Sequence, residues 1–137
     1  MTGTSDLDQA RYISLTTFKR DGTPVATPVW VTGAGGRYAF TTGEAAWKTK
    51  RLLGNPAVEV RLCDARGRVK PNVIVHTGTG EISTSRADIA AANRALAAKY
   101  GWQFRASKIV VVLRRRRRGG DQGTVAVHLS IPQYQAG

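Results

Sequence analysis

The chain has 137 residues, which is enough for one domain (1–137) with a modest core and too few for two. Basic residues outnumber acidic ones by 21 to 9, which gives a net charge of +12 at pH 7, and 42% of the residues are hydrophobic. This composition excludes a disordered chain, and the lack of a long apolar run or a signal peptide predicts a cytoplasmic protein without a membrane span. So positive a charge favours polyanionic partners, such as nucleic acid, an anionic membrane, or a phosphorylated or polyglutamylated ligand.

The first predicted elements are strands joined by tight turns. Alternation and β-forming residues predict a strand over Tyr12–Phe18, and Asp21-Gly22 after it is a strong hairpin signal. The next predicted strand, Pro24–Val31, contains two prolines, which cannot donate to a ladder and so indicate an edge, a bulge or a strand start. Glycines at 33–36 predict a turn before a third strand over Arg37–Thr42.

Helix-forming residues then predict a helix over Glu44–Leu53. Thr42 or Gly43 is expected to cap its start, and Gly54-Asn55-Pro56 is expected to stop it. Two further strands are predicted over Ala57–Leu62 and Asn72–Ile82. Glycines at 78 and 80 predict a bend or bulge in the second of these strands.

A second helix is predicted from the capping-box-like Ser85–Asp88 to Gly101, with Ile89, Ala92, Leu96 and Tyr100 at helical spacing. Residues 104–118 are compatible with either helix or strand, and the glycine pair at 119–120 ends them. The last predicted strand is Thr124–Ile131. This order of elements predicts a mainly β barrel with accessory helices.

A cluster of polar and basic residues surrounds the predicted strand-to-helix junction near residue 43. Backbone N–H groups at a helix start are unpaired and carry the positive end of the helix dipole, so they favour an anion. Lys48 and Arg51 are three residues apart and share a helix face, whereas Lys50 points to a neighbouring one. Thr41 and Thr42 add hydroxyl groups. These residues alone fit a phosphate site and a solvated surface helix equally well.

Several motifs, in order, resemble the pyridoxamine 5′-phosphate oxidase-like superfamily, and more narrowly its F420-dependent oxidoreductase branch. They are Thr23–Val31, Phe40–Thr42, Trp47–Leu52, Asn55-Pro56 and Cys63–Arg68, and the resemblance continues through Lys99–Phe104 and the later arginine run. The resemblance implies a six-stranded split β-barrel of the FMN-binding type with accessory helices. It also implies a homodimer with two cofactor sites at its interface.

In proteins of this kind, one strand lies along the tricyclic ring of the cofactor. The resemblance places the main chain of Pro28, Val29 and Trp30 against that ring. It places Thr41 and Thr42 near the ribityl-phosphate.

The phosphate-binding lysine of the family falls on Lys48, and Lys50 and Arg51 fit the basic cluster of the F420 branch. The FMN-using oxidases have phosphate-binding arginines where this chain has Thr27 and Trp47. The resemblance therefore favours F420 as the cofactor, with FMN as the alternative. F420 carries a phosphate and an oligoglutamate tail, which a basic groove complements.

The implied activity is hydride transfer from C5 of the reduced deazaflavin to a small-molecule acceptor. The protein must hold the reacting atoms about 3–3.5 Å apart and exclude water. No triad or carboxylate pair stands out, so no catalytic residue is assigned. Solvent is one source of the proton, and Tyr38, Tyr100, Tyr134 and His76 are others. Two histidines and one cysteine, Cys63, suggest neither a metal centre nor a disulfide.

Two alternatives remain at this point. The same barrel serves equally as a non-catalytic F420 or FMN carrier or sensor. The five consecutive arginines Arg114–Arg118 also allow a basic nucleic-acid-binding module. No aromatic residues are interleaved with them and no zinc-finger or RNP motif is present, which disfavours nucleic acid and favours a solvated or tail-facing run. Tryptophans 30, 47 and 102 either pack in the core or wall the pocket.

Overall fold

The computed structural model describes residues 5–43, 46–101 and 123–132. Trp102, Tyr134, the arginine run and the rest of 104–118 lie outside the described residues. The described elements, in chain order, are α1 (Ser5–Asp8), β1 (Ile13–Phe18), β2 (Pro24–Val29), β3 (Thr32–Ala34), β4 (Arg37–Gly43), α2 (Trp47–Gly54), β5 (Ala57–Leu62), β6 (His76–Ser83), α3 (Arg86–Tyr100) and β7 (Thr124–Ser130). Within these ranges no helix is long and apolar enough to cross a membrane.

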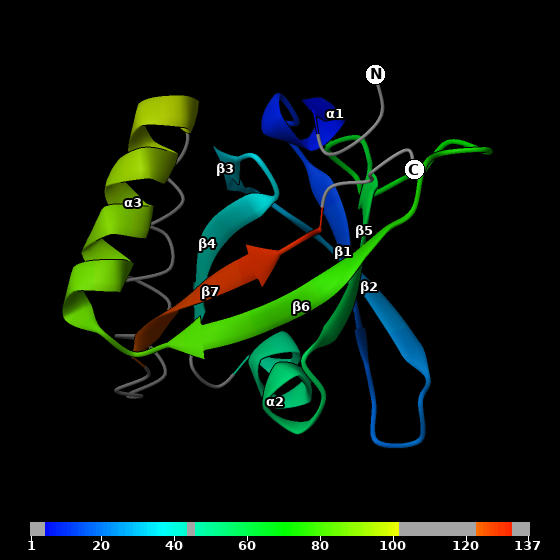
Figure 1. Cartoon of the computed structure of the whole chain (residues 1–137), viewed down its shortest axis with the longest axis horizontal. Helices are drawn as coiled ribbons and strands as arrows, with labels where there is room; N and C mark the ends of the chain where they lie inside the picture. Colours follow the sequence, from blue (N-terminus) through cyan, green and yellow to red (C-terminus); the bar gives the residue numbers. More distant parts are fainter. Residues whose placement is uncertain (1–4, 44–45, 102–122, 133–137) are drawn as a thin grey trace.

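The strands form one antiparallel sheet in the order β2-β1-β5-β6-β7-β4-β3. β2 and β3 lie at opposite edges, yet only Trp30 and Val31 join them along the chain. The sheet must therefore curl until its two edges approach each other, as Figure 1 shows. The apolar core lies inside this curl and includes Leu15, Phe40 and Val127.

The described residues contain seven strands where six were expected. The additional strand, β3, pairs with the start of β4 in a tight hairpin where the glycines predicted only a turn. Gly33 makes this pairing possible, because a Cβ there would lie 2.2 Å from the carbonyl oxygen of Arg37. The glycine is thus required by a close strand approach as well as by its φ of 132°.

The predicted edge position of the proline-containing strand is confirmed, since β2 pairs only with β1. Pro24 and Pro28 are both exposed on it. Proline lacks the N–H that a second neighbouring strand would need, so an edge tolerates it.

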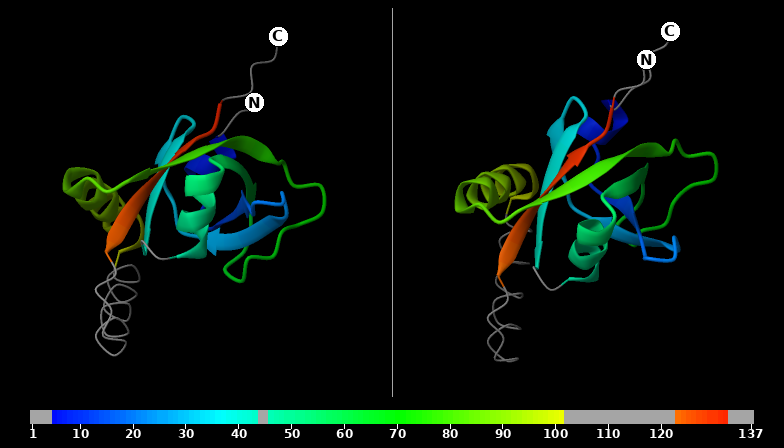
Figure 2. Two further views of the ribbon diagram at one scale, coloured as in Figure 1. Left: turned by 90° about the horizontal axis from the view of Figure 1, so that it is seen from below. Right: turned by 60° about the horizontal axis from the view of Figure 1, so that its bottom comes forward.

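Helix α2 lies across the open end of the curled sheet, as Figure 2 shows. Its predicted cap at Thr42 or Gly43 is wrong, because β4 continues through Gly43 and the N-cap is Ala46, whose side chain forms no cap bond. The Thr49 hydroxyl instead donates to the Gly43 carbonyl at 3.0 Å and ties the helix to the strand. Leu52 enters the core over Gly80, where a Cβ would lie 3.0 Å from the leucine methyl group.

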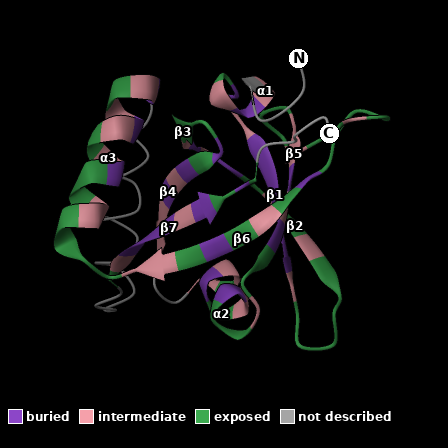
Figure 3. Ribbon diagram, in the orientation of Figure 1, coloured by how far each residue is buried: buried purple, intermediate pink, exposed green. Residues whose placement is uncertain are grey.

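The strand predicted over Asn72–Ile82 begins later, at His76. The ladder with β5 ends at the pair Val60 and His76, and Asn72 has a φ of 66°, which interrupts extended backbone. The loop before β6 is largely exposed (Figure 3). Its apolar residues Ile74 and Val75 are exposed as well, so their strand-like sequence was misleading. Gly78 allows the next strand to approach, because its Cβ would lie 2.1 Å from the Ser130 carbonyl oxygen.

Helix α3 packs on β3, β4 and β7 from outside the curl. Its prediction is confirmed at both ends, since the Ser85 hydroxyl accepts from the Asp88 N–H and Gly101 follows the last turn with a φ of 65°. The buried residues Ala92, Leu96 and Tyr100 repeat every four positions and form the contact face.

Candidate functional site

Five of the eight predicted site residues line one pocket of about 210 Å³. Its lining comprises Val29, Trp30, Phe40, Thr41, Thr42, Lys48 and Leu96. These residues come from the end of β2 and the link after it, the end of β4, the first turn of α2 and the second half of α3. The curl of the sheet brings the β2 end beside the β4 end, which are far apart in strand order.

Lys48 supplies the charge of this pocket. Its burial, and secondarily the nearby Arg51, lower the pKa of its ammonium group below the ordinary value of 10.5. Among the described residues, none forms a hydrogen bond or ion pair with it. A partly desolvated cation with no carboxylate partner in the described part of the chain favours an anionic ligand.

The other walls combine hydroxyl and apolar groups. The Thr41 hydroxyl donates to the side-chain oxygen of Asn93 on α3 at 3.0 Å, which fixes its orientation. Phe40 and Leu96 are almost fully buried and form an apolar floor. The pocket thus has an apolar part and a cationic end with hydroxyls, which suits a ligand with an apolar body and an anionic group.

Pro28 is not brought into this pocket. It is exposed on the outer side of β2, where a Cβ on Gly67 would lie 3.2 Å from its ring. Side chains alternate between the two sides of a strand, so Pro28 and Val29 face opposite ways.

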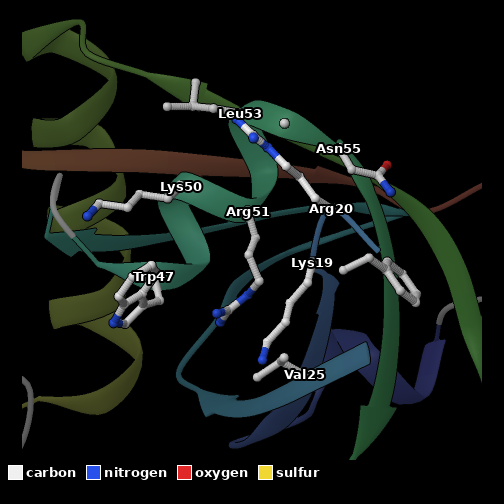
Figure 4. A pocket seen from close by; sticks show the side chains of 10 residues that line it. Lys19, Arg20, Val25, Trp47, Lys50, Arg51, Leu53 and Asn55 are labelled. Carbon is white, nitrogen blue, oxygen red and sulfur yellow. The ribbon is translucent and has the colours of Figure 1, made fainter. Parts of the chain in front are cut away.

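Lys50 and Arg51 line a second cavity, a groove of about 1120 Å³ between α2 and the β1–β2 hairpin (Figure 4). The full lining is Phe18, Lys19, Arg20, Val25, Trp47, Lys50, Arg51, Leu53, Gly54 and Asn55. It contains four basic residues and no acidic one. Sequence analysis missed Lys19 and Arg20, because only the folding of the hairpin against α2 brings them to the helix.

The helix cations line two different cavities. Lys48 and Arg51 are three residues apart in α2, and Lys48 lines the pocket while Arg51 lines the groove together with Lys50. The reason is that the Arg51 Nε donates to the buried Thr17 hydroxyl on β1 at 2.6 Å, which draws the side chain away from the pocket. The Lys50 ammonium lies 4.6 Å from the ring centroid of Trp47, whose side chain is exposed.

The described residues named as proton donors are engaged elsewhere. The Tyr38 hydroxyl donates to Asp8 at 2.6 Å, and His76 lies 3.2 Å from the Asp6 carboxylate. The Tyr100 hydroxyl contacts backbone groups of Arg11 and Val31. None of the three side chains lines either cavity. The described residues also contain no cluster of histidine, cysteine and acidic side chains that fits a metal ion.

A model of the pyridoxamine 5′-phosphate oxidase family matches residues 5–131, which is nearly the whole chain. The chain belongs to this family. The resemblance found in the motifs is therefore confirmed at family level, and the curled antiparallel sheet is the architecture of this family. Comparison with curated protein sequences gives no match.

Several solved structures share this fold. An F420 reductase superposes with a TM-score of 0.61 at 19% identity, over 94% of this chain and 92% of that one. A conserved hypothetical protein from Mycobacterium tuberculosis superposes with a TM-score of 0.65 at 19% identity, over 91% of this chain and 75% of that one. The heme storage protein HutZ from Vibrio cholerae superposes with a TM-score of 0.63 at 12% identity, over 92% of this chain and 84% of that one. At these identities the comparisons establish the fold, and the argument for function must come from the site.

Proposed function

We propose that the chain is an oxidoreductase that binds the deazaflavin F420 and transfers hydride from its reduced form to a small-molecule acceptor. The observation that carries the proposal is the pocket that joins Lys48 to Val29, Trp30, Thr41 and Thr42. Three separate elements contribute these residues, so their meeting is a property of the fold and not of one local motif. The similarity in fold to an F420 reductase supports the choice of cofactor.

The chemistry of the two cavities fits such a cofactor. The strand end at Val29 and Trp30 would lie along the ring, and Lys48 with Thr42 would hold the phosphate. The groove with Lys19, Lys50 and Arg51 would hold the acidic tail. FMN ends in a single phosphate and leaves the groove cations unused, so the groove favours F420 over FMN.

We further propose that the active form is a homodimer. Cofactor sites usually have volumes of about 300–1,000 Å³, and the pocket of about 210 Å³ is too small to enclose a tricyclic ring. A second copy of the chain would supply the missing wall.

When bound, the reduced deazaflavin supplies the hydride. The chain's own residues bind and orient the cofactor and exclude water from it. Lys48 fixes its anionic end, and Trp30, Phe40 and Leu96 form apolar walls. Among the described residues that line the pocket, none is a carboxylic acid or histidine, so the completing proton is assigned to solvent. The site works by positioning, for which about 3–3.5 Å between the reacting atoms is required.

The experiment is to follow the oxidation of reduced F420 by its absorbance, with a panel of activated alkenes and quinones as acceptors. The proposal predicts acceptor-dependent oxidation that falls in the Lys48→Gln variant and persists in the surface variant Arg86→Gln. Arg86 is exposed at the start of α3 and lines neither cavity. Tight binding of F420 without oxidation by any acceptor would instead favour a carrier, a role for which the fold shared with a heme storage protein gives a precedent.

A further inference from the structure

The last turn of α3 holds the two-residue link that joins the edge strands β2 and β3. The Lys99 ammonium donates to the carbonyl oxygens of Ala10 at 2.6 Å and Val31 at 2.7 Å. The Tyr100 hydroxyl accepts from the Val31 N–H at 3.1 Å and lies 2.7 Å from the carbonyl oxygen of Arg11. One hydroxyl proton serves one acceptor at a time, so Tyr100 donates to Arg11 while Lys99 satisfies the Val31 carbonyl.

These hydrogen bonds satisfy backbone groups that would otherwise be buried without a partner. Val31 is only 1% exposed and lies between the ladders of β2 and β3, so neither ladder satisfies its N–H and C=O groups. A buried backbone group without a partner costs about 1–3 kcal/mol. Lys99 and Tyr100 therefore determine where this link lies.

The same turn also fixes a wall of the pocket. The Trp30 indole stacks on the Tyr100 ring, with centroids 4.7 Å apart and an angle of 14° between the planes. Leu96, one turn earlier on α3, lines the pocket beside Trp30 and packs in the same apolar cluster. Tyr100 thus sets the position of Trp30 at the pocket, although Tyr100 does not itself line the pocket.

We propose that Tyr100, assisted by Lys99, is a positioning residue that holds the Trp30 wall in the orientation required by the planar part of the ligand. The ligand class, a planar ring with an anionic end, rests on the proposed function. Tyr100 acts through Trp30 and the Val31 backbone and touches no reacting atom.

The test variant is Tyr100→Phe, which keeps the ring for stacking and removes only the hydroxyl. The matched control is Tyr38→Phe, because Tyr38 is equally buried and also loses a hydroxyl bond, the one to Asp8, without lining the pocket. Loss of a buried hydrogen bond lowers the stability of both variants by about 1 kcal/mol or more, so thermal unfolding alone does not separate the two roles.

The first readout needs no cofactor. With Trp47 and Trp102 replaced by phenylalanine, Trp30 is the single tryptophan, and acrylamide quenching of its fluorescence reports how firmly it is held. Tyr100→Phe should raise the quenching constant about twofold at a temperature where the protein is folded, and Tyr38→Phe should leave it unchanged. Equal quenching in Tyr100→Phe and its parent would overturn the proposal, whatever the ligand proves to be.

The second readout compares two ligands in otherwise unaltered chains. Tyr100→Phe should weaken F420 binding about tenfold, while inorganic phosphate, which needs only the Lys48 end of the pocket, keeps its affinity within about twofold. Tyr38→Phe should leave the ratio of the two affinities unchanged. A ratio that is the same in all three proteins would contradict a positioning role, whereas a parent protein that binds phosphate but no F420 would contradict the proposed function instead.

Discussion

Lys48 and Arg51 leave the same helix toward different cavities. Lys48 lines the small pocket at the ends of β2 and β4, whereas Arg51 is drawn to Thr17 and lines the basic groove on the hairpin side. The two charges remain close enough for Arg51 to contribute to the lowered pKa of Lys48. Side chains of α2 therefore line two cavities, Lys48 the small pocket and Lys50 with Arg51 the basic groove.

Replacement of Lys48 by glutamine should weaken the binding of phosphate and of F420 by tenfold or more. A charge-assisted hydrogen bond in a partly desolvated site contributes about 1.5–3 kcal/mol, and 1.4 kcal/mol corresponds to a factor of ten. Isothermal titration calorimetry measures both affinities, with Arg86→Gln as the control. Unchanged phosphate affinity in Lys48→Gln would remove Lys48 from the site.

The lowered pKa of Lys48 predicts a specific pH dependence. Anion affinity should fall as the pH rises toward that lowered pKa, before the ordinary value of 10.5 is reached, because the ammonium loses its proton. Lys48→Arg should hold its affinity constant over this range, since arginine stays protonated. Phosphate titrations from pH 8 upward make the comparison, and parallel pH profiles of the two proteins would contradict the assignment.

The lowered pKa of Lys48 also affects the stability of the protein, and here raising the pH is favourable. Between the lowered folded-state pKa and 10.5, the unfolded chain binds more protons than the folded one, so the Lys48 contribution to the free energy of unfolding rises with pH. Below this window Lys48 is charged in both states and its burial is a constant cost. Urea unfolding of the ligand-free protein should therefore show a smaller gain on raising the pH in Lys48→Gln than in the parent.

The groove predicts that affinity depends on the length of the acidic tail. Long-tailed F420 should bind more tightly than short-tailed F420. Replacing both Lys19 and Arg20 by glutamine should reduce this gain in affinity about tenfold at low salt. The reduction should be smaller at high salt, where charges are screened. The matched double variant is Arg86→Gln with Arg94→Gln, two exposed cations of α3 that line neither cavity. An equal loss in the two double variants would indicate a general charge effect and not a tail site.

Self-association should depend on the loop between β5 and β6. Ile74 and Val75 are 56% and 43% exposed there, which is unfavourable for apolar side chains unless a partner covers them. Light scattering should give twice the mass of one chain, and Ile74→Asp with Val75→Asp should shift the protein to one chain with weaker F420 binding. A monomeric parent protein that binds F420 would contradict the need for a second copy.

The sequence predicted those parts of the fold that depend on local pattern. Alternation located β1, the helical spacing of Leu96 and Tyr100 located α3, and the prolines indicated the edge strand β2. The start of β6 was misplaced because Ile74 and Val75 have a strand-like composition on an exposed loop. The helix cap was misplaced because pairing with β7 extends β4 through Gly43.

Long-range contacts explain what the sequence did not reveal about the site. Motif order and residue type indicated Lys48, Thr41 and Thr42, which the pocket brings together. Lys19 and Arg20 reach α2 only because the hairpin folds against it. The hydrogen bonds of Tyr100 with Val31 and Arg11 span 69 and 89 positions of sequence, and no local pattern predicts such contacts.

We propose that the Lys48 pocket and the basic groove together select F420. The most direct measurement is a side-by-side titration of the purified protein with F420, FMN and haem, repeated on Lys48→Gln. The account predicts that F420 binds more tightly than FMN, that haem binds most weakly, and that Lys48→Gln reduces the F420 affinity tenfold or more. Tighter binding of FMN or haem than of F420, or F420 binding that is indifferent to Lys48, would contradict it.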